Sequence, residues 1–523
     1  MTTRSPGTED LNRAAIRTTA WRPQAISQPI PIATTAAAAC VFAGSGYAAD
    51  WLAAAGNVVS FFARVCEAAL RHRGDVVNQR MYGVGRARRV RLIGFLIAVS
   101  QSVMPSAWAI PPPPIVFTVN TSFDSWDDSP GDGSCDNGLG FCTLRAAVME
   151  ANRSASNVTI VLPADTYTLT GPVAGIDEYT GDLNLTAPAA GNRVITITGA
   201  GAATTIIDAN GKDRVLTVSA GRTATIGRVT LRNGSPAAGG GGGIQNHGVL
   251  TLTNVVVRDN HNNVSGGGGI YSDNQLGIYS STITLNVSSA DDGGGIENEN
   301  VGSGLTIVNS TIDRNVARDG GGLYNGSTTI VMVNSTVSEN AASRNGGGIY
   351  SGGGLADTIN IYNSTIVGNE ADSDADDVGI GAGLYNEAGA TLNLRNSVVA
   401  GNYLSGAQSY DDCTGVIGMY GNNKFSPTVA CTVAPGSPGT ATTLDSVYEL
   451  GILQDNGGAT RTHAIVPPSS LIHGGTACVD QNSAYLAADQ RGRARPPSPP
   501  NPLGSTCDIG AFEYNEIFAS GFE

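Results

Sequence analysis

The sequence has few charged residues, few aromatic residues and almost no lysine. Charged residues make up 14% of the 523 residues, against about 25% in a typical globular domain, and aromatic residues make up 6%. The lysines are Lys212 and Lys424, and the chain from Ile110 onward holds 18 basic and 39 acidic residues. The resulting net charge of −21 on that part argues against nucleic acid and anionic membrane surfaces as partners.

Sequence patterns of several enzyme and metal-site classes are also missing. The chain has no recognisable GxSxG nucleophile elbow, no lysine in its glycine runs, and no CxxC or paired histidines. Serine hydrolase, P-loop and structural zinc chemistry therefore have no support. The apolar run from Leu92 to Met104 has 13 residues and is interrupted by Ser100 and Gln101, whereas a membrane-spanning helix needs about 20.

Glycine, by contrast, is abundant, with 69 residues, and it recurs in a regular pattern. An aliphatic residue closes successive glycine runs at spacings of 26, 26, 27, 26 and 35 residues: Ile244, Ile270, Ile296, Leu323, Ile349 and Leu384. A second landmark, an asparagine that ends a short β-rich run, keeps the same phase: Asn233, Asn260, Asn286, Asn315, Asn340, Asn369 and Asn402. A period of this length indicates a solenoid or array, whose units are too small to bury their own apolar faces.

The composition of one unit predicts which solenoid this is. Residues 305–315 and 391–402 alternate apolar and polar side chains and are rich in Ile, Val and Thr, as half-buried strands are. The unit is too short for a propeller blade and lacks the leucine-rich pattern. We therefore predict an all-β parallel β-helix with about three short strands per coil and coils about 4.8 Å apart.

One asparagine position recurs inside the repeat and is expected to have a structural role. It is occupied by Asn309, Asn334, Asn363 and Asn396. Asparagine tolerates the left-handed conformation, and stacked amides can hydrogen-bond along the axis as a ladder. The first three also begin Asn-Ser-Thr glycosylation sequons. Because the sequon repeats in phase with the core, we interpret these asparagines as a structural ladder first.

The first 109 residues predict export. Arg86 to Arg91 is a basic segment, Leu92 to Met104 is apolar, and Ala107-Trp108-Ala109 has the pattern of a cleavage site, which together indicate a signal peptide at 81–109. Residues 1–80 lack the strand pattern and are expected to be a disordered, mis-assigned upstream extension. We expect the protein to be secreted or to lie at the cell surface, associated with the outer membrane.

An exported chain is also expected to form disulfides, because extracellular compartments are oxidising. Beyond the leader the sequence keeps an even number of cysteines: Cys135, Cys142, Cys413, Cys431, Cys478 and Cys507. Six cysteines allow 15 connectivities. Proximity in the chain favours pairing 135 with 142, 413 with 431, and 478 with 507.

Two further segments carry a resemblance to a known family. Residues 131–152, GDGSCDNGLGFCTLRAAVMEAN, resemble the CSLREA-type N-terminal segment of exported bacterial right-handed parallel β-helix proteins. Residues 453–514, which include LQDNGGATRTHAIVPPSSLI, DQRGRARP and CDIGAFEY, look like the choice-of-anchor segment of polymorphic outer-membrane-type proteins. The resemblance implies a right-handed β-helix with a short N-terminal capping helix and a C-terminal disulfide-containing cap.

We expect the capping helix to begin at Thr143, which keeps the N-cap of a capping box, while Ala146 replaces its reciprocal Glu. The domains expected from these features are an N-terminal cap at 110–157, coils of about 26 residues at 158–410, C-terminal coils and cap at 411–514, and a tail at 515–523.

Acidic residues supply the candidate sites. Asp372, Asp374 and Asp376 alternate, with Asp377 adjacent, as in oxygen-rich Ca²⁺ loops, although the EF-hand's Glu is missing. We therefore include calcium as the one cofactor to consider. Asp291 and Asp292 form a second acidic pair before a glycine run.

The expected function is that of a non-catalytic, monomeric surface or secreted protein with an adhesion or glycan-binding role. Its expected partner is an extracellular polysaccharide or surface glycan, and the mature chain has no predicted membrane span. The alternative is a pectate-lyase-like lyase or hydrolase acting on acidic polysaccharide, which would need a carboxylate pair, or Ca²⁺-binding carboxylates beside an Arg or Lys base.

Overall fold

The computed structural model describes residues 114–171, 179–188, 191–299, 304–326, 329–352, 357–427, 431–496 and 506–514. The predicted signal peptide, the upstream extension and the C-terminal tail lie outside the described residues. Within the described ranges, no helix has the length and apolar character needed to cross a membrane.

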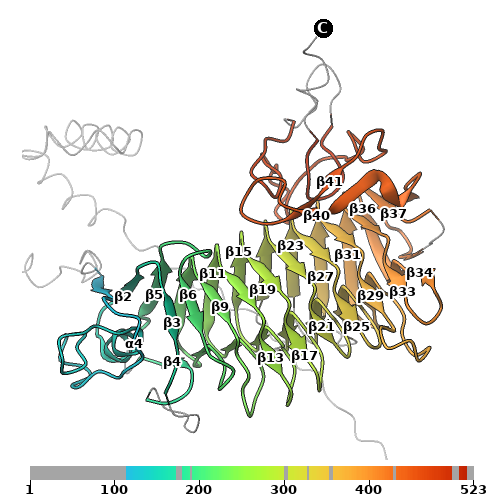
Figure 1. Cartoon of the computed structure of the whole chain (residues 1–523). Helices are drawn as coiled ribbons and strands as arrows, with labels where there is room; N and C mark the ends of the chain where they lie inside the picture. Colours follow the sequence, from blue (N-terminus) through green and yellow to red (C-terminus); the bar gives the residue numbers. More distant parts are fainter. Residues whose placement is uncertain are drawn as a thin grey trace, which may run out of the picture. The chain divides into compact units, whose positions relative to one another are not determined.

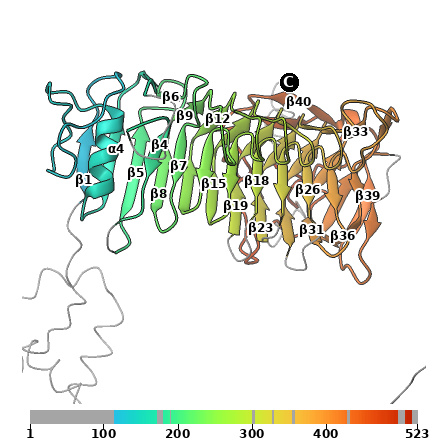
Figure 2. The same ribbon diagram turned by 90° about the horizontal axis from the view of Figure 1, so that it is seen from below.

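The described chain winds into coils that stack along one axis and build four long sheets, named A to D here (Figures 1 and 2). Sheet A comprises β1 (Ile115–Thr118), β2 (Val158–Leu162), β5 (Val194–Gly199), β8 (Thr223–Gly227), β11 (Val249–Thr253), β15 (Leu276–Tyr279), β19 (Gly304–Val308), β23 (Thr329–Val333), β27 (Thr358–Tyr362), β31 (Thr391–Arg395), β36 (Val416–Tyr420) and β38 (Thr432–Val433). Sheet B comprises β3 (Thr166–Thr168), β6 (Ile206–Asp208), β9 (Thr230–Arg232), β12 (Val256–Arg258), β16 (Thr282–Thr284), β20 (Thr311–Asp313), β24 (Thr336–Ser338), β28 (Thr365–Val367), β32 (Val398–Ala400), β37 (Asn422–Phe425) and β39 (Thr440–Thr443).

The other two sheets have shorter strands. Sheet C comprises β4 (Leu183–Leu185), β7 (Leu216–Val218), β10 (Ile244–Asn246), β14 (Ile270–Ser272), β18 (Ile296–Asn298), β22 (Leu323–Asn325), β26 (Ile349–Ser351), β30 (Leu384–Asn386) and β35 (Cys413–Thr414). Sheet D comprises β13 (His261–Asn262), β17 (Val287–Ser288), β21 (Val316–Ala317), β25 (Ala341–Ala342), β29 (Glu370–Ala371), β33 (Tyr403–Leu404) and β34 (Ser409–Tyr410).

One coil passes through sheets C, A, B and D in turn, as β10, β11, β12 and β13 do, and then returns to sheet C at β14. The short fourth strand in sheet D was not predicted, since we expected about three strands per coil. Successive coils pair in parallel, for example β10 with β14 and β11 with β15. The protein is therefore an all-β, right-handed parallel β-helix, as predicted.

The repeat landmarks of the sequence form the core of the coils. The six aliphatic landmarks pair in register in sheet C, from Ile244 with Ile270 to Ile349 with Leu384, and all six are fully buried. Each coil therefore places an equivalent aliphatic side chain on the one before it, which confirms the repeat as the basis of the core.

The amide ladder exists, but at another position than the predicted one. The asparagines of the second landmark stack along the axis: the Nδ2 groups of Asn260, Asn286, Asn315, Asn340 and Asn369 each donate to the Oδ1 of the next member at 2.9 Å, ending at Asn402. The predicted ladder residues do adopt the left-handed conformation, with φ of 52° at Asn309 and 48° at Asn334, Asn363 and Asn396.

The side chains of that predicted set make different contacts, because they lie at an outer corner of the coil. The Nδ2 groups of Asn334, Asn363 and Asn396 donate to the carbonyl oxygens of Ala488, Val479 and Ala477. All three acceptors belong to a C-terminal segment, residues 450–496 and 506–514, which we call the strap. The outer asparagines therefore bind the strap rather than one another.

The strap starts after a 3₁₀ turn, η4 (Val447–Glu449), with the antiparallel pair β40 (Leu450–Gln454) and β41 (Thr462–Ile465). It runs along the side of the coils, over the strands β23, β27 and β31 (Figure 1). The disulfide Cys478–Cys507 lies within it. Cys135–Cys142 lies beside the N-terminal helix and Cys413–Cys431 in the last coils, so the three disulfides have the pairing that proximity favoured.

The helix α4 (Leu144–Arg153) lies at the N-terminal end of the coils, beside β1 (Figure 2), and contacts β2 and β4. Leu144, Ala147, Val148 and Ala151 belong to the same apolar core as the coils. Thr143 is its N-cap: the Thr143 Oγ1 accepts a hydrogen bond from the Ala146 N–H at 3.1 Å and donates to the Ser125 carbonyl oxygen.

Replacing Thr143 by alanine should therefore weaken this end of the β-helix. The variant loses the N-cap acceptor and one further hydrogen bond, so we expect a cost of about 1 to 2 kcal/mol in the free energy of unfolding. Denaturant unfolding of Thr143→Ala and of the control Thr143→Ser measures it. Equal stability of the two variants would contradict the capping role.

Candidate functional site

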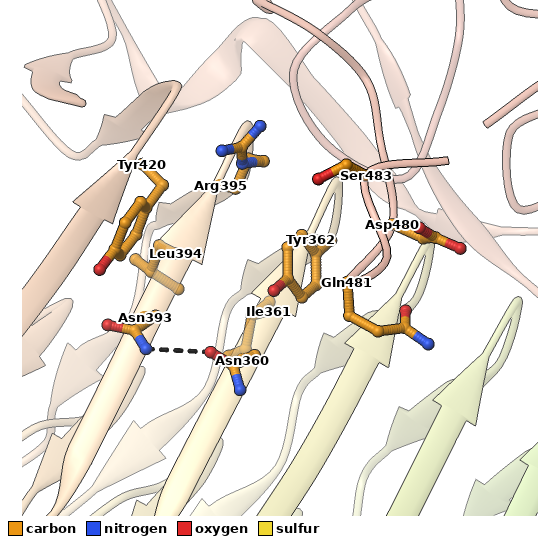
Figure 3. Close-up of a pocket in the computed structure, with 10 residues that line it drawn as sticks. All are labelled: Asn360, Ile361, Tyr362, Asn393, Leu394, Arg395, Tyr420, Asp480, Gln481 and Ser483. Carbon is orange, nitrogen blue, oxygen red and sulfur yellow. Dashed lines mark hydrogen bonds between the residues drawn. The ribbon is translucent and has the colours of Figure 1, made fainter. Parts of the chain in front are cut away.

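A groove lies where the strap meets the outer face of sheet A (Figure 3). Its volume is about 270 Å³. The ends of β27, β31 and β36 form its floor, and residues Asp480, Gln481 and Ser483 of the strap form one wall. Because the strap is some 60 to 120 residues away in the sequence, this groove exists only in the folded chain.

The floor consists of two rows of outward side chains, set by strand register. The outer row is Tyr362, Arg395 and Tyr420, and the inner row is Asn360, Asn393 and Gly418. Neighbouring strands are about 4.8 Å apart, so the two tyrosines stand on strands about 9.6 Å apart with Arg395 between them. The Asn393 Nδ2 donates to the Asn360 Oδ1 at 2.9 Å.

Gly418 keeps the inner row open. A Cβ atom at Gly418 would lie 2.2 Å from the Asn393 Oδ1, so a side chain there would displace the Asn393 amide. The absence of that side chain leaves Asn393 facing the groove beside Tyr420, as Figure 3 shows.

The tyrosines present aromatic surface, and the phenol of Tyr362 is neutral. Tyr420 is 37% exposed and Tyr362 is half-buried. Burial raises the pKa of Tyr362, the carboxylate of Asp480 and the phenol of Tyr420 raise it further, and Arg395 opposes these effects. Tyr362 is therefore a protonated hydrogen-bond donor at neutral pH.

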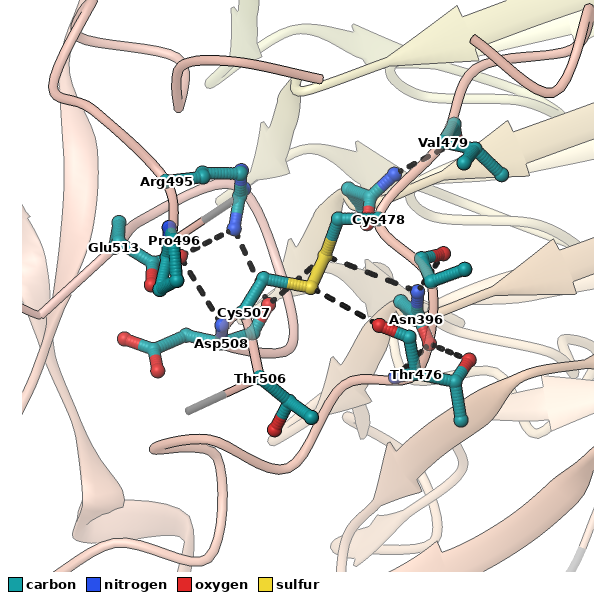
Figure 4. Close-up of a disulfide and its surroundings, with 12 residues drawn as sticks. Asn396, Thr476, Cys478, Val479, Arg495, Pro496, Thr506, Cys507, Asp508 and Glu513 are labelled. Carbon is teal, nitrogen blue, oxygen red and sulfur yellow. Dashed lines mark hydrogen bonds and ion pairs between the residues drawn. A yellow bond between two sulfur atoms is a disulfide. The ribbon is translucent and has the colours of Figure 1, made fainter. Parts of the chain in front are cut away.

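The strap wall is held firmly against the coils (Figure 4). The disulfide Cys478–Cys507 closes the loop that carries Asp480 to Ser483. The Asn396 Oδ1 accepts hydrogen bonds from the N–H and the Oγ1 of Thr476 at 3.1 and 3.0 Å. On the other side of the disulfide, the buried Arg495 Nη1 pairs with the Glu513 carboxylate at 2.7 Å.

The DQRG and CDIGAFEY motifs of the sequence hold the strap together. The Asp489 carboxylate pairs with Arg491 and accepts the Glu513 N–H. The buried Gln490 bonds the Oγ1 atoms of Thr311 and Thr336 in sheet B. The polar residues of these motifs are thus used in attaching the strap to the coils.

The predicted calcium loop is an acidic cluster in the structure. The carboxylates of Asp372, Asp374 and Asp376 have ligand atoms within 4.8 Å of one another. Asp372 is buried, and its two carboxylate oxygens accept the N–H groups of Asp376 and Gly406 at 3.0 and 2.9 Å. Asp377 follows in a left-handed conformation, with φ of 63°. Calcium binding at this cluster stays a prediction.

A second acidic cluster surrounds the Asp291–Asp292 pair at the edge of sheet C. Arg318 Nη2 lies 2.8 Å from Asp291 Oδ1 and 3.1 Å from Asp292 Oδ1. Glu297, on β18, is only 5% exposed, and its Oε2 is buried with no hydrogen-bond partner in the described part of the chain. Burial raises the pKa of Glu297 to about 9, and Glu299, Asp291 and Asp292 raise it further while Arg318 lowers it.

The sequence analysis did not predict a functional role for the groove residues or for Glu297. An alignment of the repeats does mark both, because the residue type changes within a column. In sheet A, the column that holds Val308 and Val333 changes to Tyr362, Arg395 and Tyr420. In sheet C, Glu297 interrupts a column of tyrosines: Tyr271, Tyr324, Tyr350 and Tyr385.

Comparison with known proteins assigns the chain to no family. No protein-family model matches the sequence, and no curated protein matches it. Among solved structures, the crystal structure of pectate lyase Pel9A is similar over 77% of this chain and 98% of that chain, with 18% sequence identity and a TM-score of 0.43. A similarity of this extent carries no argument about activity.

Proposed function

We propose that the protein is an exported, non-catalytic β-helix protein of the cell surface or extracellular medium that binds glycan chains through the groove on sheet A. The observation that carries the proposal is the pair of tyrosines flanking an amide and a guanidinium on one open floor. Aromatic rings cover the apolar faces of sugar rings, and amides and guanidinium groups bond sugar hydroxyls. An adhesion role follows where the bound glycan belongs to another cell.

The chemistry of the lining favours binding over the alternative of cleavage. Asp480 is the carboxylate among the described groove residues, and its Oδ1 accepts the N–H groups of Asn482 and Ala484 at 2.8 and 2.9 Å. Hydrolysis would need two facing carboxylates. Elimination would need Ca²⁺-binding carboxylates beside an Arg or Lys base, whereas Arg395 shares the described lining with the single carboxylate of Asp480.

Export is proposed from the sequence. The predicted signal peptide and the segments that resemble the CSLREA-type and choice-of-anchor regions support it. The three disulfides of the structure are compatible with an oxidising compartment. Secreted and envelope fractions of a producing cell, probed for this chain, test the localisation.

A binding experiment tests the groove. The purified protein is screened on a glycan array, and its affinity for the best oligosaccharide is measured by titration calorimetry. We expect Tyr362→Ala and Tyr420→Ala each to weaken binding at least tenfold, because each removes one aromatic wall, a loss of about 1.4 kcal/mol or more.

Tyr279→Ala is the matched control. Tyr279 lies in the same column of sheet A, on β15, and is 37% exposed, but it is not part of the groove lining. Equal losses in the control and in the groove variants would contradict the proposal. Release of unsaturated or reducing sugar ends from polysaccharide would instead support the lyase or hydrolase alternative.

A further inference from the structure

Arg395 gives the groove a positive charge that the binding of neutral sugars does not require. Its Nε is buried and has no hydrogen-bond partner within the described part of the chain. Its side chain lines the groove between Tyr362 and Tyr420 (Figure 3). Each of the three well-buried arginines of the described chain has at least one acceptor: Arg145 pairs with Asp124, Arg495 pairs with Glu513, and the Arg222 Nε donates to the Thr186 carbonyl oxygen. The Arg222 Nη2 and the Arg495 Nε also lack a partner, so the difference at Arg395 is that none of its guanidinium nitrogens has an acceptor among the described residues.

No carboxylate within the described residues lies within ion-pair distance of the Arg395 guanidinium. Asp480 stands on the facing wall, and its Oδ1 is already used by two N–H groups of its own loop. A partly buried cation without a counter-ion is costly, and a ligand anion removes that cost. The groove therefore has one receptor for negative charge that the protein itself does not fill.

The backbone that carries Arg395 is held in place by hydrogen bonds. The Arg395 carbonyl oxygen accepts the Asn363 N–H at 2.8 Å and the Ser397 Oγ at 3.0 Å. The following residue, Asn396, is bonded to Ala477 and Thr476 of the strap. A pre-organised fork of N–H donors suits bidentate binding of a carboxylate or sulfate group.

We propose, on the basis of the glycan-binding function above, that the groove selects sugars that carry an anionic substituent, a carboxylate or a sulfate ester. The sugar ring lies between Tyr362 and Tyr420, its hydroxyls face Asn393 and Asn360, and its anionic group pairs with the Arg395 guanidinium. The side of the ring toward Asp480 carries no negative group.

The test compares oligosaccharides of equal length that differ in charge: a uronate oligomer, a sulfated oligomer and the neutral parent. Affinities are measured for the full chain and for Arg395→Gln. We expect the full chain to bind one of the two anionic oligomers at least tenfold more tightly than the neutral one, and the comparison of these two arms identifies the group. Arg395→Gln should remove this preference, because it should lower the affinity for the preferred anionic oligomer at least tenfold more than the affinity for the neutral one.

Two controls separate folding from recognition. Arg228→Gln removes an exposed arginine that donates to the Ala200 carbonyl oxygen and should leave every affinity unchanged. The thermal unfolding midpoint of Arg395→Gln should match that of the full chain, because Arg395 Nε makes no hydrogen bond to lose.

The outcomes distinguish this inference from the function it rests on. If the neutral oligomer binds as tightly as both anionic ones, or if Arg395→Gln keeps the preference, the selection for anions is overturned and the groove remains a glycan site. If no oligomer binds and Tyr362→Ala changes nothing, both the groove function and the selection are overturned.

Discussion

Glu297→Gln should stabilise the β-helix at pH 8 by several kcal/mol and leave its stability at pH 4 nearly unchanged. The Glu297 side chain is buried, and its Oε2 has no hydrogen-bond partner among the described residues. Burial raises its pKa from 4.5 to about 9. The charged groups that act on it are Glu299, Asp291, Asp292 and Arg318, with Tyr271 and Tyr324 next to it in the sheet C column.

The sign follows from the folded-state pKa, which lies above the unfolded value. The folded chain holds a proton on Glu297 that the unfolded chain releases above pH 4.5, so stability falls as pH rises from 4.5 to about 9. Each pH unit in that window costs about 1.4 kcal/mol for one proton. At pH 8 the total is on the order of 5 kcal/mol, which the uncharged glutamine does not incur.

The measurement is the free energy of unfolding of both chains between pH 4 and pH 9. Burial also raises the pKa of Asp292 and Asp412 to about 6 and that of Glu513 to about 7, so the difference between variant and wild type is the informative quantity. Glu339→Gln, whose side chain is 45% exposed, is the control and should show no such difference. A stabilisation that is equal at pH 4 and pH 8 would contradict a protonated Glu297.

The sequence predicted the β-helix because its period is visible in two independent residue types. The aliphatic row from Ile244 to Leu384 and the asparagine row from Asn260 to Asn402 keep the same phase, and in the structure each row stacks on itself. A parallel solenoid makes such alignment direct, since equivalent positions of successive units become spatial neighbours.

The roles of two asparagine rows could not be told apart from the sequence. Asn334 and Asn340 both repeat, and both suit a turn. Only the inner one faces its equivalents, with the Asn340 Nδ2 donating to the Asn369 Oδ1 at 2.9 Å. The outer one, Asn334, is bonded to Ala488 of the strap, a contact across 154 residues that no periodicity reports.

The groove could not be predicted from the sequence either, because it also depends on a contact between the coils and the distant strap. Tyr362, Arg395 and Tyr420 are recognisable as outward residues once the register is known, but the wall that makes them a groove comes from Asp480 to Ser483. The strap's motifs are recognisable, whereas its path along the coils depends on hydrogen bonds between side chains and backbone that differ from coil to coil.

Arg495→Met should detach the strap from the coils. The Arg495 side chain is fully buried. Its Nη1 pairs with the Glu513 carboxylate at 2.7 Å, and its Nη2 donates to the Gly510 carbonyl oxygen at 2.7 Å and to the Asn334 Oδ1 at 3.2 Å. Arg495 therefore joins both parts of the strap to Asn334 of the outer asparagine row, and Figure 4 shows it beside Glu513.

The expected loss of unfolding free energy is large, because removing Arg495 leaves the Glu513 carboxylate buried without its ion-pair partner. Glu513 is 2% exposed, and breaking a buried ion pair by removing one member typically costs about 3 to 5 kcal/mol. Replacing both members, in Arg495→Met with Glu513→Leu, should cost less than Arg495→Met alone, since no unpaired charge remains. The difference gives the coupling between the two residues.

Limited proteolysis with a broad-specificity protease, followed by mass spectrometry, measures detachment directly. We expect Arg495→Met to be cut within residues 455–496 at least tenfold faster than the wild type, while residues 194–427 remain intact, because the coils keep their own core. Arg493→Met, at an exposed neighbouring position, should be cut at the wild-type rate.

Arg495→Met also tests the groove, because a detached strap removes the Asp480 wall. Oligosaccharide binding by this variant should therefore fall as its cleavage rate rises. Unchanged cleavage in Arg495→Met would show that the ion pair does not hold the strap.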